Sequence, residues 1–118
     1  HILSETLASI GCECDIVEDA EDALARLCER HFDVVLLDVR LPQKSGIDLL
    51  KDLRSFGSDT VTIMVSAVVD PDTLEEARRR GCSDYIIKPF SVLEVVLSVE
   101  KALACQHMNN VWHRMLGI

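Results

Sequence analysis

The chain has 118 residues, which is enough for one domain with a hydrophobic core and too few for two. Hydrophobic residues make up 48% of it and charged residues 27%, a composition typical of globular domains that excludes a disordered or fibrous protein. The formal net charge of −8 argues against direct binding of a nucleic-acid backbone. No apolar run approaches the roughly 20 residues that cross a bilayer, and no signal-peptide pattern opens the chain. We therefore expect a cytoplasmic protein without membrane contact.

The first third of the chain predicts a helix, a strand and a second helix. Apolar residues recur at helical spacing over residues 2–10 and stop at Gly11, a residue that readily ends helices. Within residues 12–17, the acidic Glu13 and Asp15 alternate with apolar residues, which favours a strand at the edge of a sheet. Asp19 is a suitable N-cap for a helix that continues to about Arg30.

Two strongly apolar strands are predicted in the middle of the chain. Residues 34–37 read Val-Val-Leu-Leu and end at Asp38, as expected for a strand covered on both faces of a parallel sheet. A helix follows over residues 47–56. Residues 61–65 form another apolar, β-branched run, and this run ends at Ser66.

The last part of the chain predicts two more helices and a short strand. A helix begins at Asp70-Pro71, where proline fits the first turn, and stops at Gly81. Residues 83–87 form a strand that is followed by Lys88-Pro89-Phe90, and a capping box then starts a helix that reaches about residue 103. The weakly amphipathic segment 106–118 is predicted to be a helical extension or a linker.

The alternation of strands and helices predicts an α/β fold, in which a parallel sheet carries helices on both faces. Ligands of such sheets bind at the carboxyl ends of the strands. Asp38, Ser66 and Lys88 each follow or end a predicted strand. We therefore expect these three side chains to meet at one edge of the sheet.

This combination of side chains suits phosphoryl transfer. A carboxylate such as Asp38 can attack phosphorus and become an acyl phosphate. Lys88 can neutralise phosphate oxygens, and the Ser66 hydroxyl can donate a hydrogen bond to one of them. Taken singly, each residue also has a plain structural explanation, as a turn cap, a backbone hydrogen bond or a solvated lysine.

Taken together, the motifs resemble the receiver domains of response regulators in two-component signalling. The resemblance extends from the first predicted helix to the last. The matching residues are Asp38 with Pro42 and Gly46 in the phosphoacceptor loop, Ser66 as the switch hydroxyl, Tyr85 as the aromatic switch residue and Lys88-Pro89-Phe90 as the lysine signature.

The resemblance implies a flavodoxin-like, doubly wound parallel sheet with strand order 2-1-3-4-5. It implies that a histidine kinase or phosphotransfer protein passes a phosphoryl group to Asp38, so the chain is a switch that assists its own phosphorylation and dephosphorylation and not a true enzyme. It also implies a cis Lys88–Pro89 peptide. Mg²⁺ would be held by Asp38, by the backbone carbonyl of Arg40 and by acids after the first strand.

The resemblance also implies where the signal leaves the domain. Phosphorylation would change the face formed by the helix from Pro71, the strand at 83–87 and the last helix. This face would bind an output domain or protein partner, or a second copy of the chain as a dimer.

One departure from the family concerns the first strand. Here the chain opens in the first helix, so residues 1–105 are predicted to be a receiver domain without its first strand or the acids behind it. Mg²⁺ binding is therefore expected to be weak or absent. We expect a gap between the strands at 12–17 and 34–37, a strand donated there by a partner molecule, or direct pairing of the two in a strained four-stranded sheet.

Two other functions share parts of this pattern. A haloacid-dehalogenase-type enzyme also uses a strand-end aspartate, but it needs a second aspartate two residues later, where Arg40 occurs. A receiver-like interaction module that no longer accepts phosphate keeps the same fold, and labelling with a small phosphodonor distinguishes it.

Overall fold

A computed structural model describes residues 2–9, 11–41, 44–56, 60–105 and 113–117. Five strands form one sheet in the order β1-β5-β2-β3-β4, and every neighbouring pair is parallel. The elements are α1 (Ile2–Ser9), β1 (Cys12–Ile16), α2 (Ala20–Glu29), β2 (Val34–Leu37), α3 (Gly46–Ser55), β3 (Val61–Ser66), α4 (Pro71–Arg79), β4 (Asp84–Ile87), α5 (Val92–Cys105) and β5 (His113–Gly117).

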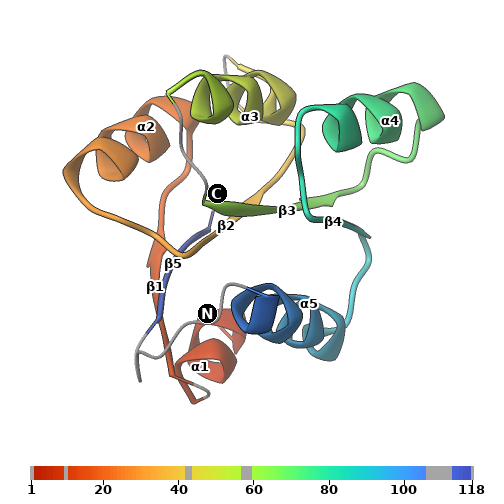
Figure 1. The fold of residues 1–118 in the computed structure, drawn as a ribbon. Coiled ribbons are helices and arrows are strands. Elements are labelled where there is room, and N and C mark those ends of the chain that lie inside the picture. The colour runs from red at the N-terminus through yellow and green to blue at the C-terminus, as the bar shows by residue number, and fades with distance from the viewer. Residues whose placement is uncertain (1, 10, 42–43, 57–59, 106–112, 118) are drawn as a thin grey trace.

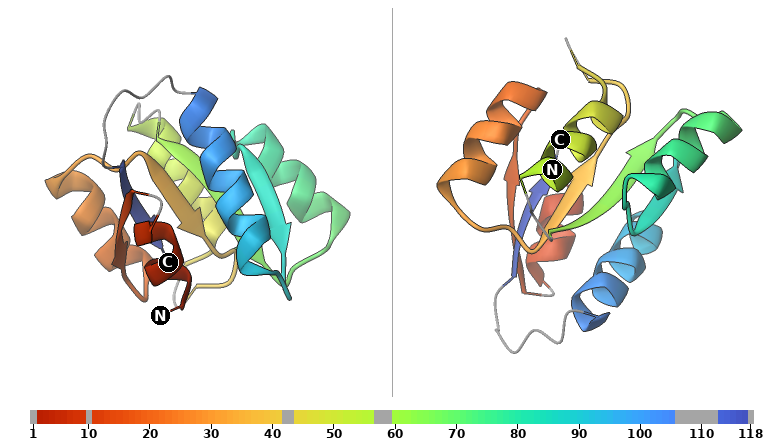
Figure 2. Two further views of the ribbon diagram at one scale, coloured as in Figure 1. Left: turned by 90° about the horizontal axis from the view of Figure 1, so that it is seen from below. Right: turned by 45° about the horizontal axis from the view of Figure 1, so that its top comes forward.

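Helices cover both faces of the sheet. Helices α2, α3 and α4 lie on one face, and α1 and α5 lie on the other (Figures 1 and 2). Successive residues of β2 point to opposite faces: Val34 packs with α1 and α5, whereas Val35 packs with α2 and α3. All four residues of β2 are buried. The α/β, doubly wound architecture predicted from the sequence is thereby confirmed.

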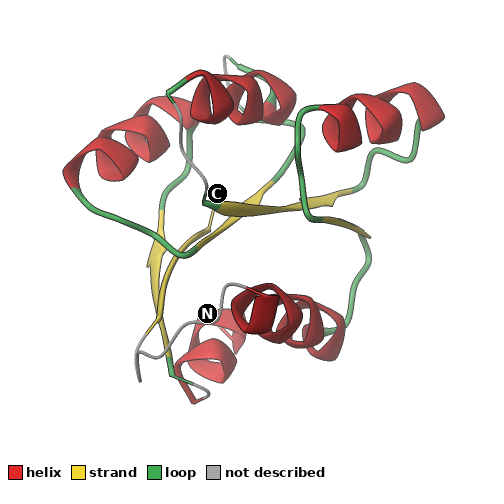
Figure 3. Cartoon of the chain, in the orientation of Figure 1, coloured by secondary structure: helices red, strands yellow, loops and turns green. Residues whose placement is uncertain are grey.

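The segment 113–117 is a strand, and not the helical extension or linker predicted from the sequence. β5 lies between β1 and β2, paired in parallel with both (Figure 3). Its side chains Met115 and Leu116 are at most 1% exposed, and they enter the cores on opposite faces of the sheet. The sequence does not separate the two structures here, because a run of five residues is too short to distinguish the helical repeat of 3.6 residues from the strand repeat of two.

β5 occupies the central position of the sheet, for which the sequence analysis offered no strand of this chain. Neither a gap, nor direct pairing of β1 with β2, nor a strand from a second molecule is present, because the chain's own β5 fills the central position. With β5 in the place of the first strand, the order matches the predicted 2-1-3-4-5 arrangement. β1 is an edge strand, as expected.

The crossover from β4 to β5 obeys the rule of handedness for parallel strands. The chain passes from β2 through β3 to β4 with α3 and α4 on one face, and then returns toward β1 with α5 on the other face (Figure 2). The connection through α5 runs in the opposite direction across the sheet and on the opposite face from those through α3 and α4, so all of them have the same handedness.

The helix starts predicted from the sequence have their capping bonds. Asp19 accepts from the Asp22 amide and Asp70 accepts from the Thr73 amide. Gly11 and Gly81 have φ of 89° and 96°, the left-handed conformation that ends a helix at low cost. Among the helices described, none is long and apolar enough to cross a membrane.

Candidate functional site

Asp38, Ser66 and Lys88 meet at the carboxyl edge of the sheet. Asp38 follows β2, Ser66 ends β3, and Lys88 follows β4. The Lys88 ammonium donates to Asp38 Oδ2 at 2.7 Å, and the Lys88 amide donates to the Ser66 carbonyl at 2.9 Å. The Lys88–Pro89 peptide is cis. The three strand ends therefore bring a carboxylate, a hydroxyl and a cation together.

Asp38 is a half-buried carboxylate that the surroundings keep ionised. Burial alone would raise its pKa, but hydrogen bonds from Lys88, from the Arg40 amide and from Ser66 together outweigh that effect and lower the pKa below its ordinary value. The Arg40 amide donates to Oδ1 at 3.1 Å. Both oxygens are thus held by donors, and the group is a carboxylate near neutral pH.

Replacing the lysine should reveal its part in this balance. In Lys88→Met the pKa of Asp38 should rise above the value in the parent chain, because the burial effect remains while the main stabilising bond is lost. Carboxyl ¹³C NMR across an acid titration measures the shift. Lys101→Met, on the exposed surface of α5, serves as the charge-matched control and should leave Asp38 unchanged.

The lowered pKa of Asp38 also makes the stability of the parent chain depend on pH. Because the folded pKa of Asp38 is lowered, the stabilisation from its ionised form is present above the unfolded pKa and is lost as the pH falls through the folded value. Lys88→Met should therefore lose part of the acid-dependent stability that the parent shows. If the Asp38 titration is the same in both chains, Lys88 does not set its ionisation.

Gly46 holds the loop after Asp38 in place by close backbone contact. Its amide donates to the Val39 carbonyl at 2.7 Å. A Cβ at Gly46 would lie 1.9 Å from the Asp38 carbonyl oxygen and 3.0 Å from the Val39 Cα. Both neighbours are backbone atoms that cannot rotate away, so only glycine fits here.

Gly46→Ala should therefore displace the Asp38 backbone and destabilise the domain by about 1–3 kcal/mol through overpacking. Among the molecules that remain folded, labelling by a phosphodonor should be reduced. Gly81→Ala is the matched control, because its cost arises from a positive φ and a contact with Arg54 far from Asp38. Chemical denaturation and labelling rates together separate the two. Equal labelling in both variants would contradict a positioning role for Gly46.

A second set of contacts joins Ser66 to Tyr85 through one residue. The Val68 amide donates to Ser66 Oγ at 3.2 Å, and the Tyr85 hydroxyl donates to the Val68 carbonyl at 2.8 Å. Ser66 is fully buried and Tyr85 is partly buried. Burial raises the pKa of Tyr85, so its hydroxyl stays protonated and remains a donor.

The arrangement at the edge of the sheet has a match among known families. The model of the response regulator receiver domain matches residues 1–100. The chain belongs to the response regulator receiver domain family. It is a phosphoacceptor receiver domain, which acts as a phosphorylation switch.

Curated relatives are longer than this receiver domain. The regulatory protein AtoC of Escherichia coli is 39% identical over 108 residues, which cover 92% of this chain and 23% of that protein. The DNA-binding transcriptional regulator NtrC of Salmonella typhimurium is 34% identical over 87% of this chain and 22% of its own length. The chain spans about a quarter of these two relatives.

Solved receiver structures share the fold. The receiver domain of the Francisella response regulator 1452 superposes with a TM-score of 0.83 at 28% identity, covering 89% of this chain and 87% of that one. The receiver domain of NtrX from Brucella abortus gives a TM-score of 0.79 at 30% identity, covering 87% and 88%.

Among the residues that the structure describes, few oxygen donors lie near Asp38 for the Mg²⁺ that the family implies. The chain offers the Asp38 carboxylate, already bonded to Lys88 and to the Arg40 amide, and the Arg40 carbonyl proposed from the sequence. In the part of the chain that the structure describes, no three His, Cys, Asp or Glu side chains are grouped to hold a metal. Magnesium sites commonly use one or two carboxylates with near-octahedral geometry.

Sequence reasoning missed two sets of backbone hydrogen bonds at the site. The amide of Arg40 bonds to Asp38, and the peptide groups of Val68 link Ser66 to Tyr85. The second contact had a signal, since a serine hydroxyl often accepts from the amide two residues later. Pro42, part of the predicted phosphoacceptor loop, lies outside the described residues.

Proposed function

We propose that Asp38 is the residue of this receiver domain that accepts the phosphoryl group. One carboxylate oxygen attacks phosphorus and forms the new P–O bond, while the bond from phosphorus to the donor breaks and its electron pair leaves with the donor. Lys88 and the Ser66 hydroxyl would hold the phosphoryl oxygens. The observation that carries the proposal is the 2.7 Å contact between Lys88 Nζ and Asp38 Oδ2.

The test is incubation with a small phosphodonor in Mg²⁺ buffer, followed by intact mass. One added phosphoryl group per chain, removed by hydroxylamine, is the expected result, because hydroxylamine cleaves acyl phosphates. A chain that takes no phosphate under conditions that label another receiver domain would favour the interaction module instead. The ion-paired geometry at Asp38 supports the phosphoacceptor and not that alternative.

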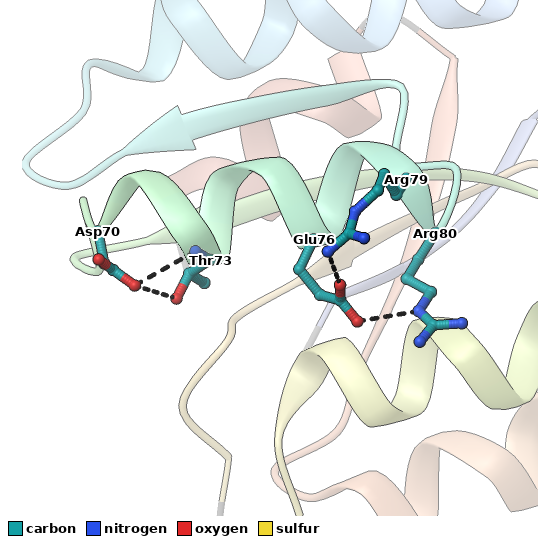
Figure 4. A network of polar contacts seen from close by, with 5 residues as sticks. All are labelled: Asp70, Thr73, Glu76, Arg79 and Arg80. Carbon is teal, nitrogen blue, oxygen red and sulfur yellow. Dashed lines mark hydrogen bonds and ion pairs between the residues drawn. The ribbon is translucent and has the colours of Figure 1, made fainter.

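We further propose that the signal passes from Ser66 to α4 through Val68. A phosphoryl group that draws the Ser66 hydroxyl toward it would pull on the Val68 amide, and the Val68 carbonyl would shift the Tyr85 ring. Val68 lies two residues before Asp70, which caps α4. Within α4, Glu76 pairs with Arg79 at 2.6 Å and with Arg80 at 3.0 Å (Figure 4).

Tyr85→Phe should weaken this coupling while keeping the ring. The variant loses the hydrogen bond to the Val68 carbonyl, so the exposure of the loop at 67–70 should increase and respond less to a phosphate mimic at Asp38. Hydrogen exchange of that loop, with and without the mimic, is the measurement. Ser91→Ala, which removes a hydroxyl at the start of α5, is the control. An unchanged response in Tyr85→Phe would disprove the coupling.

The face beside Tyr85 is our proposed partner surface. Ile87, Leu93 and Leu97 are 42–63% exposed on β4 and α5, and the charged Glu94 and Lys101 of α5 line one hollow with Ile87 and Leu97. Such an apolar stripe with a charged rim suits a protein partner. The partners we propose are a histidine kinase or phosphotransfer protein as donor, and an output domain, another protein or a second copy as receiver of the signal.

We also propose that the functional domain does not stop at residue 105. Because β5 completes the sheet beside the strand that precedes Asp38, residues 113–117 belong to the same cooperative unit as the helices before them. The same fold also supports the proposal that the domain assists phosphoryl transfer to itself and its later loss.

A further inference from the structure

The two ends of α4, which lies beside α3 at the outer end of its face of the sheet, are held in different ways (Figures 1 and 2). At the C-terminal end, the Gly81 amide donates to the Arg78 carbonyl at 3.0 Å. The Cys82 amide donates to the Ala77 carbonyl at 3.1 Å. With the positive φ of Gly81, these bonds form a Schellman motif, which closes the last turn of a helix. Ala77 is also the one buried residue of α4, so this end is held by its own backbone and by the core.

Arg54 of α3 ties the same end of α4 to the rest of the domain. Its Nη1 donates to the Thr60 carbonyl, just before β3, at 3.1 Å, and its Nη2 donates to the Gly81 carbonyl at 3.0 Å. The side chain also packs closely on Gly81, because a Cβ there would lie 2.9 Å from Arg54 Nε. Hydrogen bonds from a charged donor are stronger than neutral ones, and the planar guanidinium places two of them at once. Arg54 thus joins α3, the start of β3 and the turn after α4.

The N-terminal end of α4 has no comparable tie among the residues that the structure describes. The Asp70 carboxylate accepts hydrogen bonds from the amide and the hydroxyl of Thr73, so its bonds stay within the segment that it caps. No side chain over residues 70–75 is fully buried. The loop before the helix is held to β4 by the hydrogen bond from the Tyr85 hydroxyl to the Val68 carbonyl. This end therefore depends on the contact through which the signal is proposed to pass.

We propose that Arg54 holds the C-terminal end of α4 in place during switching, so that the signal moves only the N-terminal half of the helix and the loop before it. The inference rests on the proposed route through Val68 and sets its limit. A change at Val68 meets an exposed first turn, whereas beyond Ala77 it meets the core and the bonds of Arg54. The surface that changes with phosphorylation is then residues 67–75, and not the arginines at residues 78–80.

The test uses Tyr85→Phe as the trigger, because loss of the bond to Val68 loosens the N-terminal end of α4 without any phosphate. Amide hydrogen exchange of Tyr85→Phe and of the parent chain is compared by NMR. Exchange should become faster by up to about tenfold over residues 68–75, the effect of one lost hydrogen bond. It should stay unchanged at Gly81 and Cys82. An equal change at both ends of α4, or no change at either, would overturn the proposal.

The same trigger in a chain without the Arg54 bonds tests the anchor itself. Arg54→Met removes the donors and keeps an apolar stem, and Arg54→Lys keeps the charge without the planar pair of donors. In both backgrounds, Tyr85→Phe should also speed exchange at Gly81 and Cys82. Lys51→Met is the matched control, because it removes the same charge from an exposed position of α3. In that background the change should still end before Gly81.

A merely structural role of Arg54 gives a different result. The additional effect of Tyr85→Phe is taken within each background, so a general loss of stability in Arg54→Met cancels from the comparison. If Tyr85→Phe leaves Gly81 and Cys82 unchanged in Arg54→Met and in Arg54→Lys, the two residues act independently and the proposal is wrong. Equal spreading in Lys51→Met would also overturn it, because the lost charge and not the bonds to the carbonyls would be responsible.

The anchor and the phosphoacceptor can fail separately. Phosphodonor labelling is measured on the parent chain used for hydrogen exchange. If the exchange pattern depends on Arg54 as expected while Asp38 takes no phosphate, the proposed function is wrong and the anchor still holds. If Asp38 is labelled and the changes in exchange run along all of α4 in the parent background, the anchor is wrong and the phosphoacceptor remains.

Discussion

Asp38→Asn should abolish labelling by a small phosphodonor, because the amide cannot replace the carboxylate oxygen that attacks phosphorus. Asp38 directly follows a fully buried strand, and its carboxylate contacts Lys88. Intact mass after incubation with the phosphodonor should show full labelling of the parent and none of the variant.

The variant should remain folded. Asp38 is half-buried, and exchanging its carboxylate for an amide removes a burial cost together with the bond to Lys88, so the free energy of unfolding should change by roughly 1 kcal/mol at most. Asp48→Asn, at an exposed position in the first turn of α3, is the matched control and should be labelled like the parent. Full labelling of Asp38→Asn at another residue would refute the assignment.

The edge of the sheet that holds the site was predictable from the sequence because its parts are local. The Val-Val-Leu-Leu run sets β2 as a buried parallel strand, and a parallel strand delivers the next residue, Asp38, to the carboxyl edge. The same reasoning holds for Ser66 at the end of β3 and for Lys88 after β4. The apolar pattern of each strand and the alternation of strands and helices determine which residues lie at the strand ends, and both are visible in the sequence.

The place of β5 was not predictable in the same way. Its pairing with β1 joins residues that are about a hundred positions apart, so no local pattern announces it. Met115 and Leu116 are apolar neighbours, which fits both a strand buried on two faces and part of a helical stripe. Tertiary structure determines that residues 113–117 form a strand. β1 and β2 need a neighbour between them, and β5 forms the hydrogen bonds that their backbone groups require.

The contacts through Val68 escaped prediction for a different reason. They use the backbone amide and carbonyl, so the identity of the side chain carries no signal. The sequence identified Ser66 and Tyr85 as a pair because their side chains are distinctive. It did not show that the loop before α4 passes between them.

Leu116→Asp should unfold the chain or leave it close to unfolding. Leu116 is fully buried in β5 and packs in the core with Val35 and Leu37 of the neighbouring strand. Truncating a buried leucine to alanine costs about 2–5 kcal/mol, and a carboxylate without a partner in that core costs more. Domains of this size are stable by about 5–15 kcal/mol in total. The loss should therefore consume most of the stability, and it should appear as a lowered melting temperature and a lowered denaturant midpoint.

Leu93→Asp provides the matched control, because the same substitution falls on a side chain that is 63% exposed in the first turn of α5. Its free energy of unfolding should stay within about 0.5 kcal/mol of the parent, and the new carboxylate near the helix N-terminus is electrostatically favourable. Leu116→Ala gives an intermediate case that remains folded enough to measure. If Leu116→Asp were as stable as Leu93→Asp, β5 would not be part of the folded sheet. β2, the strand before Asp38, would then have no neighbour on the side of β1. The helices on both faces would have to hold β1 and the strands β2 to β4 together without β5.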